Sequence, residues 1–140
     1  MRWKLRPYSE SDFALVIDSW LKSSREHGLS GFKRSDIVKL IETKTIRICC
    51  DEEKPEVIHG WICHGVHPYG GPQLWYVYVK EMFRRQGLAS WLIRSTMPEQ
   101  WAPVITTPEF EKLRAKLKAS EGDGNNGVRN EPGKESARGL

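Results

Sequence analysis

The chain has 140 residues, of which 39% are hydrophobic and 29% charged; this is enough for one domain with a buried core and excludes a wholly disordered or fibrous protein. Its apolar runs stay far below the roughly 20 residues that span a bilayer, so we expect no membrane-spanning segment. The formal net charge of +4 does not by itself indicate nucleic-acid binding, and it suits an anionic ligand such as a nucleotide equally well.

A short strand at 3–6 and two helices are predicted in the first third of the chain. Residues 9–12 form a capping box that starts the first helix, and Gly28 is a candidate to end it. The second helix is expected to begin at Ser35 as its N-cap. The apolar residues of the first helix are spaced as one amphipathic face: Phe13, Val16, Ile17, Trp20 and Leu21.

Between the second helix and residue 79 the hydrophobic period changes to two, which is typical of strands. Strands at 45–50 and 56–63 are expected to form a hairpin around a polar turn. A loop rich in Gly and Pro at 67–72 leads to a third strand at 74–79. That strand is apolar on both of its faces, which indicates a central strand covered on both sides.

The remaining elements complete a mixed fold. We expect a helix over 87–95, a short strand at 104–106 and a last helix that begins at Thr107. Residues 119–140 contain too few apolar side chains to offset the entropy lost on ordering, which predicts a flexible, disordered polar tail. The order of elements therefore indicates an α/β (α+β) domain over residues 1–118, with helices packed on a sheet.

The segment after the third strand predicts an anion-binding site. The strand ends at Val79, and a short loop then brings in Arg84 and Arg85, whose charges suit phosphate. Gly87 and Ala89 keep the start of the following helix free of bulky side chains, so its exposed backbone N–H groups and its dipole attract anions. The expected ligand is a pyrophosphate on a nucleotide-like cofactor.

This segment resembles motif A of the GNAT superfamily of acyl-CoA-dependent N-acyltransferases, whose signature is Q/R-x-x-G-x-G/A. Phe83 stands where the family commonly has an aromatic residue, and the order of elements over residues 2–107 is similar to the family's. The resemblance implies a mixed, mostly antiparallel sheet flanked by helices. The residues that fit the signature are Arg84, Arg85, Gln86, Gly87, Leu88 and Ala89.

The resemblance also implies acetyl-CoA as co-substrate and transfer of its acetyl group to an amine acceptor, either a small molecule or a protein. The main chain of the strand before the motif would pair with the pantetheine arm, and the motif would hold the pyrophosphate. The cofactor-binding residues that the resemblance implies are Val77, Tyr78, Val79, Arg84, Arg85, Gln86, Gly87, Leu88, Ala89 and Ser90.

The sequence departs from the family's pattern on the acceptor side. Gln73 stands where members often have a Glu that takes the proton of the amine, and an amide cannot do this at neutral pH. There is no Tyr after Tyr78 to reprotonate the CoA thiolate, and the sixth and seventh strands have no counterpart. Candidates for a replacement catalytic base are His64, His67 and Glu81, since a histidine is suited to proton transfer near neutral pH.

Two other functions stay open at this point. One is a catalytically inactive GNAT-like module that binds CoA or a protein partner, which Gln73 and the missing Tyr favour. The other is nucleic-acid binding, which rests only on the net charge and is not expected. No metal is expected, because the spacing of the histidines and Cys63 matches no usual zinc pattern.

The start of the chain and its cysteines predict a cytoplasmic protein. Residues 1–7 contain no apolar region of a secretory signal. Three cysteines, of which Cys49 and Cys50 are adjacent, form no disulfide framework and suit a reducing compartment. A homodimer is compatible with the sequence, and an accessory protein of a phage or mobile element is our guess for a chain with so short a C-terminal half.

Overall fold

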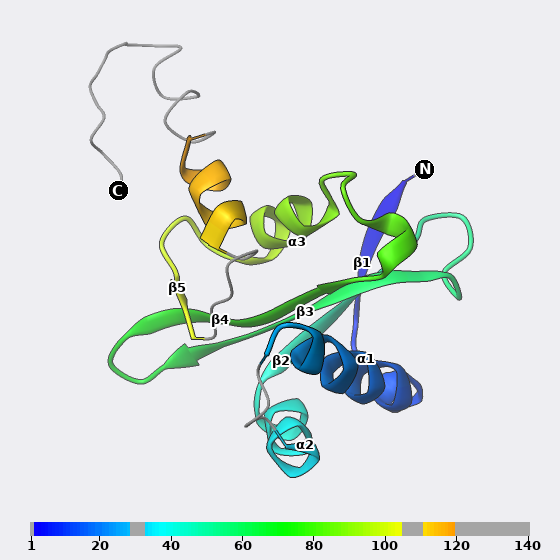
Figure 1. Cartoon of the computed structure of the whole chain (residues 1–140), viewed down its shortest axis with the longest axis horizontal. Coiled ribbons are helices and arrows are strands. Elements are labelled where there is room, and N and C mark those ends of the chain that lie inside the picture. The colour runs from blue at the N-terminus through cyan, green and yellow to red at the C-terminus, as the bar shows by residue number, and fades with distance from the viewer. Residues whose placement is uncertain (1, 29–32, 105–110, 120–140) are drawn as a thin grey trace. The chain divides into compact units, whose positions relative to one another are not determined.

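A computed structural model describes residues 2–28, 33–104 and 111–119, and residues 1–105 form one compact unit built on a five-stranded sheet (Figure 1). The strands lie in chain order, the first four are antiparallel, and the last is parallel to its neighbour. The strands are β1 (Trp3–Pro7), β2 (Thr45–Asp51), β3 (Ile58–His67), β4 (Gly71–Val79) and β5 (Ala102–Pro103).

Helices cover both faces of this sheet (Figure 1). Two of them, α1 (Phe13–Glu26) and α2 (Arg34–Thr43), lie on one face, and α3 (Leu88–Thr96) lies on the other. Single 3-10 turns precede α1 and α3, namely η1 (Glu10–Asp12) and η2 (Glu81–Phe83). The mixed α/β fold with a mostly antiparallel sheet is therefore confirmed. In the described residues, no helix combines the length and the apolar character needed to cross a membrane.

The main core lies between the sheet and the two N-terminal helices. Its aromatic centre is Trp20 of α1, whose ring centroid lies 4.9 Å from that of Trp61 on β3 and 5.2 Å from that of Tyr76 on β4. The amphipathic stripe predicted for α1 is confirmed, because its apolar residues are buried or half-buried in this core. The buried residues of the core are Val16, Ile17, Trp20, Ile37, Leu40, Ile46, Ile48, Trp61, Cys63 and Tyr76.

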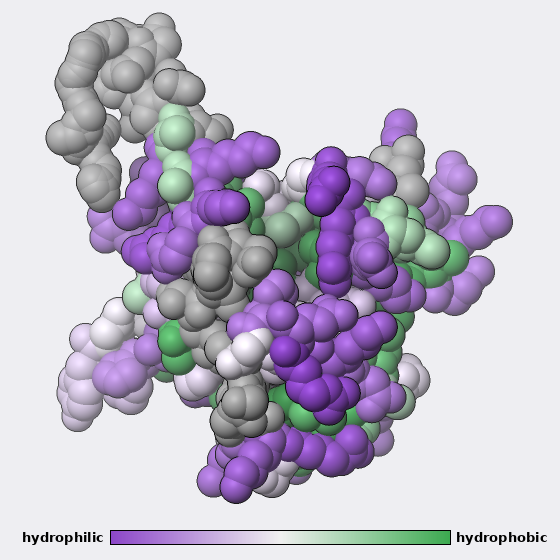
Figure 2. All heavy atoms as spheres, viewed as in Figure 1, coloured by the Kyte–Doolittle hydropathy of each residue, from purple (hydrophilic) through white to green (hydrophobic). Residues whose placement is uncertain are grey.

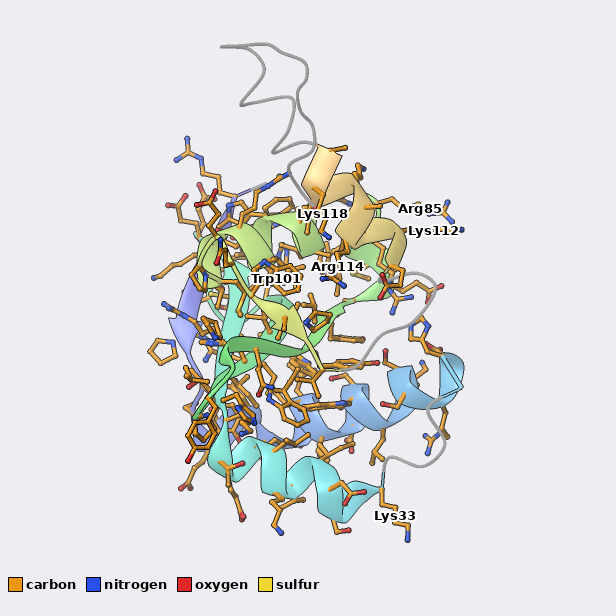
Figure 3. All side chains as sticks on the ribbon, turned by 90° about the vertical axis from the view of Figure 1, so that its left-hand side faces the viewer. Lys33, Arg85, Trp101, Lys112, Arg114 and Lys118 are labelled. Atoms are coloured by element: carbon orange, nitrogen blue, oxygen red, sulfur yellow. The ribbon has the colours of Figure 1, made fainter. Side chains whose placement is uncertain are left out.

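Several element boundaries differ from the prediction. The N-cap of α2 is Lys33 rather than Ser35, because the backbone N–H of Lys33 donates a hydrogen bond of 3.0 Å to the carboxylate of Asp36. The Lys33 side chain extends away from the helix (Figure 3). The predicted loop at 67–72 is shorter, since His67 pairs with Gly71 and both belong to the β3–β4 hairpin.

The C-terminal elements fall partly within the described residues. The last strand of the sheet lies at Ala102–Pro103, two residues before the predicted 104–106, of which only Val104 is described. Residues 111–119 are helical and belong to a second unit, 106–140. The predicted helix start at Thr107 and residues 120–140 of the predicted tail lie outside the described residues.

Candidate functional site

The turn between η2 and α3 has an unusual backbone. Arg85 has φ of 66° and is the single non-glycine residue with positive φ in the described parts of the chain, and Gly87, the N-cap of α3, has φ of 83°. A non-glycine residue in this conformation costs about 1–2 kcal/mol, and such strain gathers at functional sites. Alternating left-handed residues turn successive N–H groups toward one concave surface, which favours an anion.

The space in front of Gly87 is open. A Cβ atom built on Gly87 would meet no heavy atom within 4 Å, so a ligand can approach the backbone of the turn closely. The next residue, Leu88, is buried and anchors the start of α3. The side chain of Arg85 is exposed and extends outward from the turn (Figure 3). An open backbone turn beside an exposed guanidinium fits a phosphate group.

Arg84 connects this turn to the end of β4. Its Nε donates a hydrogen bond of 2.8 Å to the backbone oxygen of Val79. Arg84, Arg85, Gln86 and Gly87 are all exposed, whereas Ala89 and Ser90 are half-buried in the first turn of α3. The structure thus brings the predicted motif residues together around one turn, immediately after the strand that the sequence predicts beside them.

The sheet opens between β4 and β5. These strands pair only at Gln73 with Ala102 and at Leu74 with Pro103, and the N–H of Val104 donates a hydrogen bond of 2.9 Å to Leu74. The β3–β4 register shifts at the same level, which places a bulge in β4. Over residues 75–79, β4 therefore has no strand partner on its β5 side among the described residues. This segment of β4 ends at Val79, shortly before η2 and the open turn.

Comparisons with known proteins support the fold. No family model and no curated protein sequence matches the chain. Among solved structures, a Bacillus subtilis protein named as an acetyltransferase (YycN) has a TM-score of 0.62 at 15% identity, with 99% of each chain covered. An acetyltransferase related to histone acetyltransferase HPA2, from Corynebacterium glutamicum, has a TM-score of 0.59 at 17% identity over 84% of each chain. The chain has the GNAT fold.

A third structure adds the cofactor to this comparison. The aminoglycoside N-acetyltransferase AAC(6')-Iy, solved in complex with CoA, has a TM-score of 0.53 at 15% identity and covers 86% of this chain and 87% of its own. The GNAT fold that the motif and the order of elements predicted is thus confirmed. At these identities the likeness concerns the fold alone.

The sequence reasoning missed a buried histidine that supports the turn before α3. His59 on β3 is 1% exposed, and its ring stacks on that of Phe83 with centroids 3.9 Å apart and an angle of 4° between the planes. The backbone oxygen of His59 also accepts a hydrogen bond of 2.9 Å from Lys80. Phe83 precedes Arg84 directly, so this stack fixes the approach to the motif. The contact joins residues 24 positions apart, and no local signal predicts it.

Burial of His59 predicts an acid-sensitive fold. Desolvation lowers the pKa of His59, a nearby Asp51 raises it by less and Lys80 lowers it further. The unfolded chain therefore binds more protons than the folded one at pH values between the lowered folded pKa and the ordinary value of about 6.5. We expect the free energy of unfolding to fall as the pH drops through this window.

Denaturant unfolding between pH 5 and pH 8 measures this effect. The variant His59→Phe keeps an aromatic ring against Phe83 and should show a shallower decrease toward low pH. The control variant His67→Phe removes an exposed histidine and should keep the wild-type slope. Equal slopes for the wild type and His59→Phe would contradict this explanation.

The two histidines predicted as candidate bases lie apart from each other. His64 pairs with Leu74, the last β4 residue held by β5, and His67 is the final residue of β3, about 10 Å further along the strand. His64 is half-buried, and burial lowers its pKa. Its neighbour Cys63 belongs to the core under α1 and α2, so His64 points to the other face of the sheet.

His67 is exposed, and its Nδ1 accepts a hydrogen bond of 3.0 Å from the backbone N–H of Tyr69. A catalytic role of His64 or His67 stays a prediction. In the described residues, no group of three or more His, Cys, Asp or Glu side chains is arranged to hold a metal ion.

A polar pocket lies on the α1 side of the sheet, next to the end of β4. It has a volume of about 190 Å³. The sequence signal for it was the spacing of four polar residues of α1 at i, i+3, i+4 and i+7, which form a second face beside the apolar stripe and are easily taken for a solvated surface. The lining residues are Ser19, Lys22, Ser23, Glu26, Tyr78, Glu81 and Arg84.

Proposed function

We propose that this protein is an N-acetyltransferase that transfers the acetyl group of acetyl-CoA to the nitrogen of an amine acceptor. The observation that carries the proposal is the path from the edge of β4, which is unpaired after Leu74 within the described residues, to the open turn at Gly87. The GNAT fold supports the class of reaction, and the fit of the turn to a phosphate supports the cofactor.

In this proposal the chain's own residues hold the pyrophosphate and the pantetheine arm of acetyl-CoA. The backbone N–H groups at the start of α3 and the guanidinium of Arg85 bind the pyrophosphate. The main chain of Val77, Tyr78 and Val79 forms hydrogen bonds to the pantetheine arm, because none of the described strands pairs with it on that side. Arg84 keeps the turn and the strand at a constant distance through its bond to Val79.

When bound, acetyl-CoA would supply a thioester whose carbonyl carbon is open to attack by an amine. Transfer to an ammonium group removes two protons from its nitrogen, of which one ends on the CoA sulfur and the other on a base or in solvent. Gln73 cannot take that proton. Much of the rate enhancement would then come from holding the two reactants in place, which can be worth several kcal/mol.

The cofactor proposal predicts a thermal shift that depends on Gly87. Acetyl-CoA at 100 times its Kd should stabilise the wild type by about 2.7 kcal/mol, because it binds only the folded state. In Gly87→Glu, a side chain and a negative charge fill the space where the phosphate would lie, so we expect the shift to disappear. Differential scanning fluorimetry with and without acetyl-CoA measures both effects.

Gly71→Glu is the matched control, because Gly71 also has a positive φ, of 79°, and nothing within 4 Å of a built Cβ. It should lose stability through backbone strain and keep the acetyl-CoA shift. A full shift in Gly87→Glu would rule out the turn as the binding site. Tight acetyl-CoA binding without turnover on any amine would instead favour the inactive CoA-binding module, for which Gln73 is the supporting residue.

A further inference from the structure

The charged side chains of the polar pocket are not neutralised by one another. Lys22 and Glu26 project from α1, and Glu81 and Arg84 from the segment after β4. Within the described parts of the chain, none of the four belongs to an ion pair within 4 Å. The hydrogen bond of Arg84 to Val79 uses Nε, which leaves the other guanidinium nitrogens free to bind a ligand. The pocket therefore presents two positive and two negative groups.

The floor of this pocket is polar and rigid. The hydroxyls of Ser23 and Tyr76 form a hydrogen bond of 2.7 Å. The Oγ of Ser19 accepts a hydrogen bond of 2.9 Å from the Trp61 indole and lies 2.6 Å from the backbone oxygen of Leu15, to which it donates. Buried polar groups cost free energy unless they are paired in this way. The pairing holds both serines at fixed positions beneath the four charges.

The pocket lies beside the proposed path of the pantetheine arm. Tyr78 belongs to the β4 segment that pairs with no described residue on the β5 side, and it lines the pocket. Glu81 lies three residues further on, in η2. A molecule in the pocket is therefore adjacent to the strand along which, in the proposed function, the pantetheine arm lies. The helix surfaces around this face are largely hydrophilic (Figure 2).

We propose that the pocket binds the acceptor and that the acceptor is a small zwitterion, an amino acid or a close analogue of one. Its ammonium group lies against Glu26 and Glu81, and its carboxylate against Lys22 and Arg84. This inference rests on the proposed acetyltransferase function and names its substrate class. A volume of about 190 Å³ is below the roughly 300–1,000 Å³ of pockets for drug-sized ligands, which favours a molecule of amino-acid size over a protein segment.

Binding measurements on the whole protein test the proposal without turnover. Calorimetry with each of the twenty amino acids, in the presence of CoA, identifies the best binder. That amino acid is then compared with its carboxamide, which lacks the negative charge, and with its α-hydroxy acid, which lacks the positive charge. We expect each analogue to bind roughly tenfold or more weakly, because each leaves two charged side chains without a partner.

Single variants assign the two halves of the site. Lys22→Met should weaken binding of the amino acid and leave binding of the carboxamide unchanged. Glu26→Gln should weaken binding of the amino acid and leave binding of the hydroxy acid unchanged. Lys39→Met and Glu42→Gln remove exposed charges from α2 and serve as matched controls. The proposal is overturned if no amino acid binds, or if the carboxamide or the hydroxy acid binds as well as the amino acid does.

The acetyl-CoA thermal shift separates failure of this inference from failure of the proposed function. If the protein shows the shift and acetylates uncharged or carboxylate-free amines as fast as amino acids, the proposed function holds and the zwitterion proposal is wrong. If the protein binds an amino acid in calorimetry without CoA but shows no acetyl-CoA shift, the proposed acetyltransferase function is wrong. Gly87→Glu should still bind the amino acid, since Gly87 does not line the pocket.

Discussion

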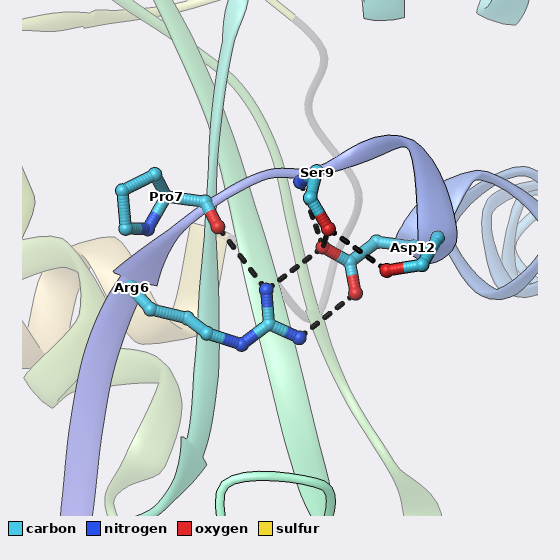
Figure 4. A network of polar contacts seen from close by, with 5 residues as sticks. Arg6, Pro7, Ser9 and Asp12 are labelled. Atoms are coloured by element: carbon cyan, nitrogen blue, oxygen red, sulfur yellow. Dashed lines mark hydrogen bonds and ion pairs between the residues drawn. The ribbon is translucent and has the colours of Figure 1, made fainter.

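Replacing Arg6 by methionine is expected to destabilise the protein by about 3–5 kcal/mol at neutral pH, because it leaves a buried carboxylate without its partner. Asp12 is only 3% exposed, and Arg6 binds it with two hydrogen bonds of 2.8 Å from its two terminal nitrogens (Figure 4). The backbone N–H of Ser9 adds a third bond of 2.9 Å. This network joins the end of β1 to the start of α1.

The loss should depend on pH in a defined direction. The hydrogen bond from Arg6 is the largest of the effects that lower the pKa of Asp12, and Ser9 contributes further. A lowered folded pKa means that the stability from this pair is present above the unfolded value of about 4 and is lost as the pH falls through the folded pKa. The difference in unfolding free energy between wild type and Arg6→Met should therefore shrink toward pH 3.

Arg2→Met is the matched control for urea unfolding. Arg2 also pairs with a carboxylate, Glu52, but at 3.5 Å and with side chains that are 82% and 48% exposed. An exposed pair of this kind contributes at most about 1 kcal/mol. A loss in Arg6→Met as small as that in Arg2→Met would show that Asp12 finds water or another partner. Adding Asp12→Asn to Arg6→Met should recover part of the loss.

A methyl group at Gly60 should separate the two central strands. A Cβ on Gly60 would collide with the backbone oxygen of Tyr78, and a main-chain atom cannot move aside as a flexible side chain does. We expect Gly60→Ala to lower the free energy of unfolding by about 1–3 kcal/mol. The displaced segment of β4 is also the proposed pantetheine edge, so the acetyl-CoA thermal shift should decrease as well.

Gly65→Ala is the comparison on the same strand. Its Cβ would lie 3.0 Å from Cδ of Lys44, the middle of a long side chain that can move away. We expect a smaller loss of stability and an unchanged acetyl-CoA shift. Urea unfolding and fluorimetry of both variants measure the difference. Equal losses would mean that β3 and β4 adjust to an added methyl group at either position.

The sequence predicts best those elements whose signals are local. The stripe of α1 lies within one short segment, and its residues are buried or half-buried in the core. The Arg84–Ala89 motif is equally local, and its residues surround the turn before α3. Boundaries that depend on a partner strand are predicted less well. Pro103 has no N–H to donate, yet it lies in β5 because Leu74 faces it and Val104 supplies the next hydrogen bond.

The parts of the candidate site that the sequence did not predict depend on contacts between distant segments. Ser19 and Ser23 look like solvated positions of a helix until Trp61 and Tyr76 are seen to bond to them. Glu81 was a candidate base from the motif's neighbourhood, but its proximity to Glu26 requires the fold. Charge signs and spacing within one helix cannot indicate which other element completes a pocket.

The short pairing between β4 and β5 has a consequence for how the free protein behaves at high concentration. A strand with unbonded backbone groups is a template on which another extended chain can add. In the described residues, the β4 segment after Leu74 is such a template, since β5 leaves it after two residue pairs. A pantetheine arm along this edge would occupy the same hydrogen-bonding groups as an intruding strand. Bound acetyl-CoA would therefore reduce self-association through this edge in addition to serving as a substrate.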